Sequence, residues 1–214
     1  MVSRDVIFWD VDTQRDFMLP GGKLYGSGAE KIIPNLRRLT DRAREGAVFL
    51  VSSACAHTPD DEEFRHWPPH CVKGTPGQQK ILETLTGQVW VLPNRPNADW
   101  PKSFGEVQQV VLEKQDLDVF SNPNTDELLE RLASFAKKDA EFAVFGVFIE
   151  YCVERAAKGL LDRGRRVALV TDAIQTLDRA KGKQTLDELV GRGARLVTTD
   201  QVLAQLSPIS SVMR

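Results

Sequence analysis

Short apolar runs alternate with amphipathic helical patterns along almost the whole chain, and this alternation limits the fold more than any other feature. The runs that we interpret as strands are 6–9, 47–52, 89–92, 107–112, 142–147, 167–170 and 195–197, of which 89–92 is the weakest. The intervening spacing predicts helices over 34–44, 125–136, 151–163 and 184–190. Strands that alternate with helices are typical of a parallel α/β sheet. We therefore expect a doubly wound, mostly parallel sheet of about six strands with helices on both faces.

The chain has 214 residues, enough for one α/β domain with a sizeable buried sheet. It shows no internal repeat, low-complexity tract or linker, so residues 1–214 are predicted to form a single domain. The segment 57–101 departs from the pattern because it is rich in Pro, Gly, Trp and charge. It is too long for a plain connection, and we expect it to form a lid or insertion.

The charge, the hydropathy pattern and the cysteine count indicate which partners and which compartment to expect. The chain has 28 Lys and Arg against 30 Asp and Glu, so its net charge of −2 gives no reason to expect nucleic acid or an anionic membrane. No apolar run approaches the ~18 residues of a membrane span, and the N-terminus lacks a signal-peptide pattern. Three cysteines without framework spacing indicate a reducing compartment. The cytoplasm is the expected location.

Three reactive side chains follow predicted strands at the positions where the strands end. Asp12 follows the first strand, Lys114 follows 107–112, and Cys152 lies just past 142–147. In an open parallel sheet such groups gather beyond the carboxyl ends of the strands. A cysteine at a helix N-terminus is favoured as thiolate, and a carboxylate beside it can move protons. The alternative is that Cys152 is a small core residue, which buried cysteines commonly are.

Two motifs resemble those of the isochorismatase-like cysteine hydrolases. Residues 12–17 (DTQRDF) have the D-x-Q-x-D-F form of the family's first strand, and 146–153 (GVFIEYCV) resemble its nucleophile turn. Lys114 stands where the family places its catalytic lysine. The resemblance covers residues 6 to about 197. It implies the isochorismatase-like hydrolase fold and a catalytic triad of Asp12, Lys114 and Cys152.

The resemblance also implies a mechanism. The amide groups of Phe148 and Cys152 would form an oxyanion hole, with a cis peptide bond between Val147 and Phe148. Asp12 would accept the Cys152 proton and deliver it to the departing ammonia, which leaves a thioester that water then hydrolyses. Lys114 would hold both partners electrostatically.

A third segment, 67–77 (WPPHCVKGTPG), resembles the W-P-x-H-C-V-x-G-T-x-G segment of nicotinamidases and pyrazinamidases. There a divalent metal lies beside the triad, and the resemblance implies His57, Glu63 and His70 as its ligands in this chain. Zn, Fe or Mn is chemically possible, and no organic cofactor is expected. The alternative is that these histidines serve surface and hydrogen-bonding roles.

Cys55 occupies the position of the family's usual Asp ligand. A thiolate there would favour zinc, or the site is degenerate. His66 is a spare candidate ligand.

The resemblance favours hydrolysis of nicotinamide to nicotinate, a reaction of NAD metabolism. The expected substrate-binding residues are Phe17, Trp67, Val147 and Tyr151. Phe148-Ile149 replaces the Ala-Thr usual in nicotinamidases, so a different small amide, imide or carbamoyl compound is the alternative. A non-catalytic binding relative is a further alternative, against which the intact triad argues. Family members are often dimers or tetramers, so a homo-oligomer is expected.

Overall fold

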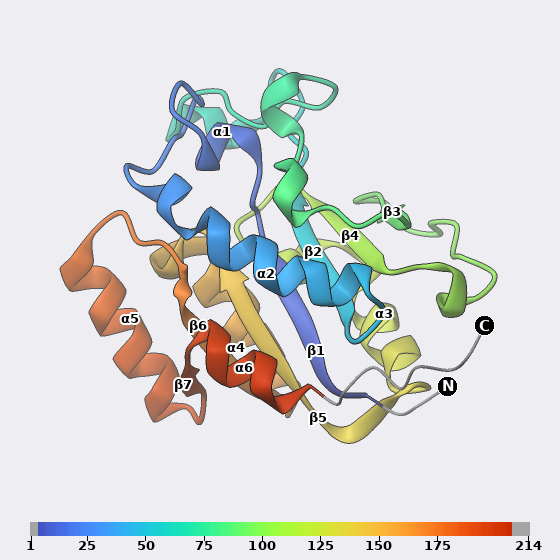
Figure 1. Cartoon of the computed structure of the whole chain (residues 1–214). Helices are drawn as coiled ribbons and strands as arrows, with labels where there is room; N and C mark the ends of the chain where they lie inside the picture. The colour runs from blue at the N-terminus through green and yellow to red at the C-terminus, as the bar shows by residue number, and fades with distance from the viewer. Residues whose placement is uncertain (1–3, 207–214) are drawn as a thin grey trace.

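A computed structural model describes residues 4–206 and shows one seven-stranded sheet (Figure 1). The strands are β1 (Arg4–Val11), β2 (Phe49–Cys55), β3 (Val89–Leu92), β4 (Gln109–Lys114), β5 (Ala136–Gly146), β6 (Arg166–Ile174) and β7 (Arg195–Val197). Their order is β3-β4-β2-β1-β5-β6-β7, and every neighbouring pair is parallel. The predicted α/β fold is confirmed, with one strand more than the six expected and a wholly parallel sheet.

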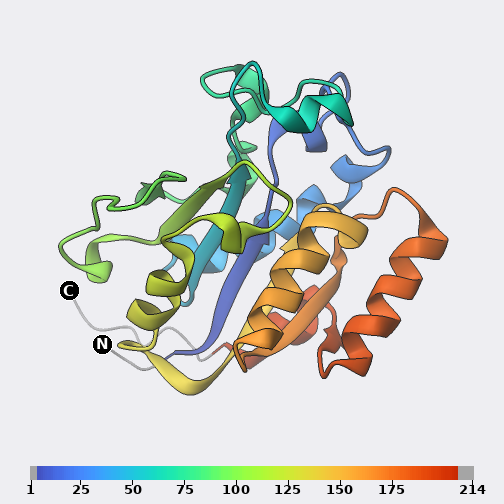
Figure 2. The ribbon, with the colours of Figure 1, turned by 180° about the vertical axis from the view of Figure 1, so that it is seen from behind.

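Helices cover both faces of the sheet. The helices α2 (Ile33–Arg44) and α6 (Thr199–Gln205) lie on the face toward the viewer in Figure 1. The helices α3 (Thr125–Leu132), α4 (Glu154–Asp162) and α5 (Arg179–Gly191) lie on the other face, which Figure 2 turns forward. Single turns complete the elements: α1 (Arg15–Met18), the 3₁₀ turns Ala29–Ile32, Glu62–Arg65, Pro76–Gln78, Leu82–Thr84, Phe104–Glu106 and Val119–Ser121, and a π turn, η7 (Ile149–Val153).

The central strand β1 is buried on both faces, which explains its continuous apolar run. Ile7 and Trp9 face the core under α3 to α5, where Trp9 packs against Phe142. Phe8 faces the core under α2 and α6, where it meets Phe145 edge to face. Because β1 pairs in parallel with β2 on one side and with β5 on the other, its carboxyl end lies between the carboxyl ends of those two strands.

Three predicted helices differ from the structure. The helix predicted over 151–163 begins only at Glu154, after the π turn η7. The helix predicted over 125–136 ends at Leu132, because the chain enters β5 at Ala136, where it pairs with Arg4 of β1. The helix predicted over 184–190 begins earlier, at Arg179. Asp178 caps it by accepting hydrogen bonds from the amides of Ala180 and Lys181, and the polar first turn hid this start from the apolar periodicity.

The segment 57–101 contributes β3 and several 3₁₀ turns, so part of it belongs to the sheet. Its middle is bound to the end of β1: Arg15 N donates to Gln79 O, and Ile81 N donates to Thr13 O. The description of this segment as a lid stays a prediction. No helix within residues 4–206 is long and apolar enough to cross a membrane.

Gly146, the last residue of β5, is predicted to be essential for stability. Its φ is +118°, and a Cβ there would lie 2.1 Å from the carbonyl oxygen of Val11. Gly146→Ala should lower the free energy of unfolding by at least about 2 kcal/mol in urea denaturation. The control is Gly164→Ala, which also has a positive φ but an open surrounding and should cost about 1 kcal/mol. Equal losses in the two variants would contradict the close approach.

Candidate active site

The structure brings Asp12, Lys114 and Cys152 together. Asp12 follows β1, Lys114 is the last residue of β4, and Cys152 lies in η7 after β5. The Nζ atom of Lys114 is 2.9 Å from Oδ2 of Asp12 and 3.5 Å from Sγ of Cys152. All three side chains are buried. An acid, an amine and a thiol from distant parts of the chain therefore meet past the carboxyl edge of the sheet.

Hydrogen bonds to β2 hold Asp12 in place. Its φ is +50°, and its Oδ1 accepts a 2.7 Å hydrogen bond from the hydroxyl of Ser53. The side chain of Gln14 accepts from the amide of Cys55 and donates to its carbonyl, both at 2.7 Å. These contacts join the ends of β1 and β2 and point the carboxylate toward Lys114. The motif match drew attention to Gln14 but not to the role of Ser53.

The surroundings of the three groups determine their charges. Burial alone would raise the pKa of Asp12, but the Lys114 ammonium and the Ser53 hydroxyl outweigh it, so this pKa is lowered. Burial would lower the pKa of Lys114, but the charge of Asp12 and its hydrogen bond with Lys114 raise this pKa well above its ordinary value. The resting pair is a carboxylate and an ammonium.

The resting Cys152 side chain is a thiol. A hydrogen bond with Cys55 and burial raise the pKa of Cys152 well above its ordinary value, although Lys114 acts in the opposite direction. Cys152 lies in the π turn before α4 begins at Glu154 and is buried, so the helix N-terminus favours the thiolate less than the sequence suggested. Attack by this sulfur requires a base, and the ionised Asp12 carboxylate is beside it.

The turn between β5 and α4 has the expected cis peptide bond between Val147 and Phe148. The carbonyl of Phe148 accepts hydrogen bonds from the amides of Tyr151 and Val153, which bends the chain around Cys152. The oxyanion role of the Phe148 and Cys152 amides stays a prediction.

A second cluster lies beside the triad. Ligand atoms of Cys55, His57 and His70 lie within 4.8 Å of one another, and all three residues are buried. The carboxylate of Glu63 faces the same point, with its oxygens 3.9 Å from Nε2 of His57 and 3.8 Å from Nε2 of His70. The structure thus gathers the three predicted metal ligands and the possible fourth. His66 is exposed and lies outside this cluster.

The chemistry of these donors fits a metal ion. Nδ1 of His57 is 3.0 Å from a carboxylate oxygen of Asp61, and Nδ1 of His70 is 2.9 Å from the carbonyl oxygen of Pro68. Each histidine therefore presents Nε2 to the cluster. Nε2 of His57 is buried and has no hydrogen-bond partner among residues 4–206. Burial lowers the pKa of His70, which keeps its imidazole neutral and able to bind a metal. Sequence reasoning missed Asp61, for which a carboxylate four residues after His57 was the available signal.

Cys55 lies between the two clusters. Its sulfur is 3.2 Å from Nζ of Lys114, which also contacts Cys152, and 3.9 Å from Oδ2 of Asp12. The interaction with Cys152 lowers the pKa of Cys55. Burial and the charge of Asp12 raise this pKa by more, so the net shift is upward. Cys55 is therefore in contact with the triad as well as with the histidines.

Aromatic rings surround the site. Phe17 packs against the ring of His70 at 5.2 Å and against Phe148 at 6.1 Å. Trp67 and Tyr151 meet edge to face at 5.5 Å. The ring of Phe148 faces Gly26, where a Cβ would lie 2.2 Å from it. The rings of Phe17, Trp67 and Tyr151 are thus near the candidate groups, as is buried Val147, while their contact with substrate stays a prediction.

A buried ion pair that sequence reasoning missed lies next to the triad. Nζ of Lys80 is 2.7 Å from Oδ2 of Asp10 and donates to the hydroxyl of Thr13 at 2.8 Å. The pair ties the segment after His70 to β1. The signal for it was an acidic residue at the end of an otherwise apolar run.

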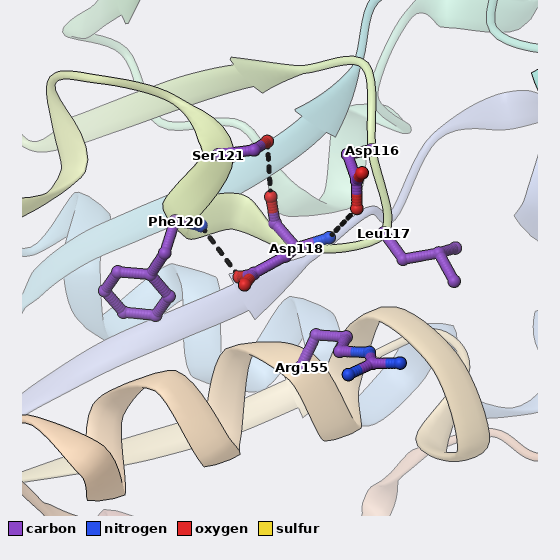
Figure 3. Close-up of a pocket in the computed structure, with 6 residues that line it drawn as sticks. All are labelled: Asp116, Leu117, Asp118, Phe120, Ser121 and Arg155. Carbon is purple, nitrogen blue, oxygen red and sulfur yellow. Dashed lines mark hydrogen bonds between the residues drawn. The ribbon is translucent and has the colours of Figure 1, made fainter. Parts of the chain in front are cut away.

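A pocket of about 380 Å³ is lined by the loop 116–121 and by Arg155 (Figure 3). Nζ of Lys114 donates to the carbonyl of Asp116 in this loop at 2.9 Å. The loop that lines it is stabilised by its own carboxylates, since Asp116 accepts from the amide of Asp118 and Asp118 from that of Phe120. Arg155 of α4 forms the opposite wall (Figure 3). The pocket therefore adjoins the triad through the backbone of Asp116.

Lys114→Met is predicted to destabilise the protein by about 3–5 kcal/mol at pH 7, because it removes the only cation paired with the buried Asp12 carboxylate among residues 4–206. The wild-type Asp12 has a lowered pKa, so its contribution is lost only as the pH falls through that value. In the variant the carboxyl pKa rises, and protonation relieves the penalty. The stability difference should therefore shrink between pH 7 and pH 5 in urea denaturation. Lys73→Met, at the exposed pair with Glu113, should cost at most about 1 kcal/mol, and a similar loss in both variants would contradict the argument.

Comparisons with known proteins agree with this geometry. The profile of the isochorismatase domain matches residues 7–201. A sequence search of curated proteins finds no significant match. Among solved structures, the pyrazinamidase of Pyrococcus horikoshii in complex with zinc has a TM-score of 0.71 at 25% identity, covering 91% of this chain and 99% of that one. The N-carbamoylsarcosine amidase of Thermoplasma acidophilum has a TM-score of 0.70 at 26% identity, covering 92% of this chain and 97% of that one.

An isochorismatase-like hydrolase of Alkaliphilus metalliredigens has a TM-score of 0.74 at 23% identity, covering 94% of this chain and 98% of that one, which shows the shared fold. The match of the domain profile along nearly the full chain, on a sheet that carries the expected acid, amine and thiol at one edge, establishes that the chain belongs to the isochorismatase-like hydrolase family.

Proposed function

We propose that this chain is a cysteine amidohydrolase, which cleaves a small amide to an acid and ammonia through a thioester on Cys152. The observation that carries the proposal is the position of Lys114, whose ammonium contacts both the Asp12 carboxylate and the Cys152 sulfur inside a buried site. This arrangement pairs an ionised base with a protonated nucleophile, and a buried cation stabilises the negative charge that moves between them.

The reaction follows from these charges. Asp12 accepts the thiol proton as the sulfur attacks the amide carbon, and Lys114 stabilises the forming thiolate. The oxyanion is held by the amides of Phe148 and Cys152, a type of interaction that contributes about 3 kcal/mol or more. Asp12 then delivers the proton to the leaving nitrogen, which departs as ammonia. Water, activated by the same carboxylate, hydrolyses the thioester and restores the thiol.

A divalent metal fits beside the triad on His57, His70, Glu63 and Cys55. Zinc is the preferred ion because a thiolate and two imidazoles are ligands that it favours. When bound, the metal would supply a positive charge able to hold a ring nitrogen or polar group of the substrate. The zinc in the pyrazinamidase of P. horikoshii supports this assignment.

Nicotinamide is the first candidate substrate, with conversion to nicotinate as a step of NAD metabolism. The candidate metal ligands Cys55, His57 and His70 and the aromatic residues Phe17, Trp67 and Tyr151 support a substrate with a flat ring and one polar ring atom. A small carbamoyl compound is the second candidate, supported by the similarity to an N-carbamoylsarcosine amidase and by the bulky Phe148 in the turn before Cys152. Three free cysteines support a reducing compartment such as the cytoplasm, and a homo-oligomer remains part of the proposal.

Cys152→Ala is predicted to abolish ammonia release while the protein keeps its fold, because the substitution removes the nucleophile from a small buried site. Ammonia release should be measured on a panel of nicotinamide, pyrazinamide, maleamate and N-carbamoylsarcosine, with circular dichroism to confirm the fold. Cys71→Ala serves as the control for loss of a buried thiol, because the Cys71 sulfur contacts the Gly77 carbonyl rather than Lys114. Turnover by Cys152→Ala at the wild-type rate would reject the proposed mechanism.

The purified full-length chain is predicted to carry about one metal ion, measured by elemental analysis. His57→Ala and His70→Ala should each lower the metal content at least tenfold, since each removes one of few ligands. The matched control is His66→Ala, which changes an exposed histidine of the same segment and should retain the metal. A metal-free wild type that binds no added Zn²⁺ and still turns over substrate would refute the metal site.

A further inference from the structure

Two of the three cysteines form a pair of facing thiols. Cys55 ends β2 and Cys152 lies in η7, on opposite sides of β1 in the sheet order. Each thiol shifts the pKa of the other, so the two side chains lie near each other. Both sulfurs also contact the same ammonium, at 3.2 Å for Cys55 and 3.5 Å for Cys152 from Nζ of Lys114. The amidase reaction proposed above uses only one of these thiols as a nucleophile.

We propose that Cys55 and Cys152 are a reversible oxidation site, at which hydrogen peroxide converts the two thiols into a disulfide. Formation of the disulfide does not depend on the proposed amidase function. The disulfide would also stop amide turnover, and that effect rests on the proposed function.

The chemistry balances in two steps. In the first, the Cys152 sulfur attacks one peroxide oxygen; the O–O bond breaks, the sulfur is oxidised to a sulfenic acid, and the thiol proton leaves with the other oxygen as water. In the second, the Cys55 sulfur attacks the sulfenic sulfur, an S–S bond forms, the S–O bond breaks, and the hydroxide takes the Cys55 proton to leave as water. Two thiols and one peroxide thus give one disulfide and two waters. A dithiol reductant reverses the process by thiol–disulfide exchange.

The surroundings assist each step. Oδ2 of Asp12 lies 3.9 Å from the Cys55 sulfur and 2.9 Å from Nζ of Lys114, which contacts the Cys152 sulfur, so one carboxylate is placed to accept a proton from either thiol. Lys114 contacts both sulfurs, so it stabilises whichever sulfur carries negative charge during oxidation or leaves as thiolate during reduction. A lone Cys152 sulfenic acid would be open to further, irreversible oxidation to the sulfinic acid. The Cys55 thiol prevents this by reacting with the sulfenic acid to form the disulfide.

Cys71 is a poor partner for this reaction. Its sulfur is within 3.9 Å of the carbonyl oxygen of Gly77. Its backbone amide donates a 2.7 Å hydrogen bond to Asp16, and its φ of +45° belongs to a tight turn. The side chain is fully buried and makes no contact with Lys114 within hydrogen-bond distance. Cys71 therefore provides the internal control.

The test is peptide mapping of the full-length protein after brief exposure to hydrogen peroxide. Remaining thiols are blocked with N-ethylmaleimide, and the protein is digested with trypsin without reduction. The three cysteines fall on separate peptides, 45–65, 66–73 and 139–155, so mass spectrometry identifies which pair is linked. We expect 45–65 joined to 139–155, and a fall in titratable thiols from three to one that dithiothreitol restores.

Two variants separate this proposal from general oxidation. In Cys55→Ser, Cys152 should proceed to the sulfinic acid, and dithiothreitol should not recover the thiol. In Cys71→Ser, the same 45–65 to 139–155 link should form as in the wild type. Linkage of 66–73 to either peptide, or irreversible oxidation of Cys152 in the wild type, would overturn the proposal. Because these readouts are masses and thiol counts, they hold even if the substrate panel shows no ammonia release.

Discussion

The buried ammonium of Lys114 is the interaction on which the rest of the site depends. Moving a lysine charge out of water costs several kcal/mol, and a folded protein retains it only where partners compensate. Lys114 has a carboxylate oxygen and a backbone carbonyl at 2.9 Å each, from Asp12 and Asp116, and two sulfurs within 3.5 Å. Asp12 stays ionised because this cation is there, and the cation stays charged because Asp12 is there. The proposed proton acceptor and the proposed charge stabiliser are therefore one coupled ion pair.

A second buried pair, Asp10 and Lys80, shows why burial alone does not make a catalytic group. Asp10 and Asp12 are two residues apart at the end of β1, and each has a lysine within 3 Å. Asp10, however, also accepts from the hydroxyls of Thr13 and Ser52, and Lys80 donates to Thr13. Through these contacts the Asp10–Lys80 pair holds the segment after His70 against β1. Of the two carboxylates, Asp12 has sulfurs near it, which is why the proposed mechanism assigns the role of base to Asp12.

The sequence predicted the sheet and the triad well because both depend on local patterns. The apolar run 6–9 identifies a strand buried on both faces, and the D-x-Q-x-D-F motif and the turn around Cys152 mark its functional end. The protonation state of Cys152 could not be predicted from the sequence, because it depends on burial and on Cys55, which is 97 residues away. The Ser53, Asp61 and Lys80 contacts were missed for the same reason: polar residues near strand ends are common, and only the folded chain shows which of them face a charge.

Cys55 connects the two chemistries of the site. As a metal ligand it would be a thiolate held toward His57 and His70, and as an oxidation partner it must turn its sulfur to Cys152. One sulfur cannot do both at once, so metal binding and disulfide formation are mutually exclusive in a single molecule. A carboxylate at this position would bind metal without any such competition. If both proposals hold, the thiol makes metal binding at Cys55, His57 and His70 and the availability of Cys152 depend on the same redox state.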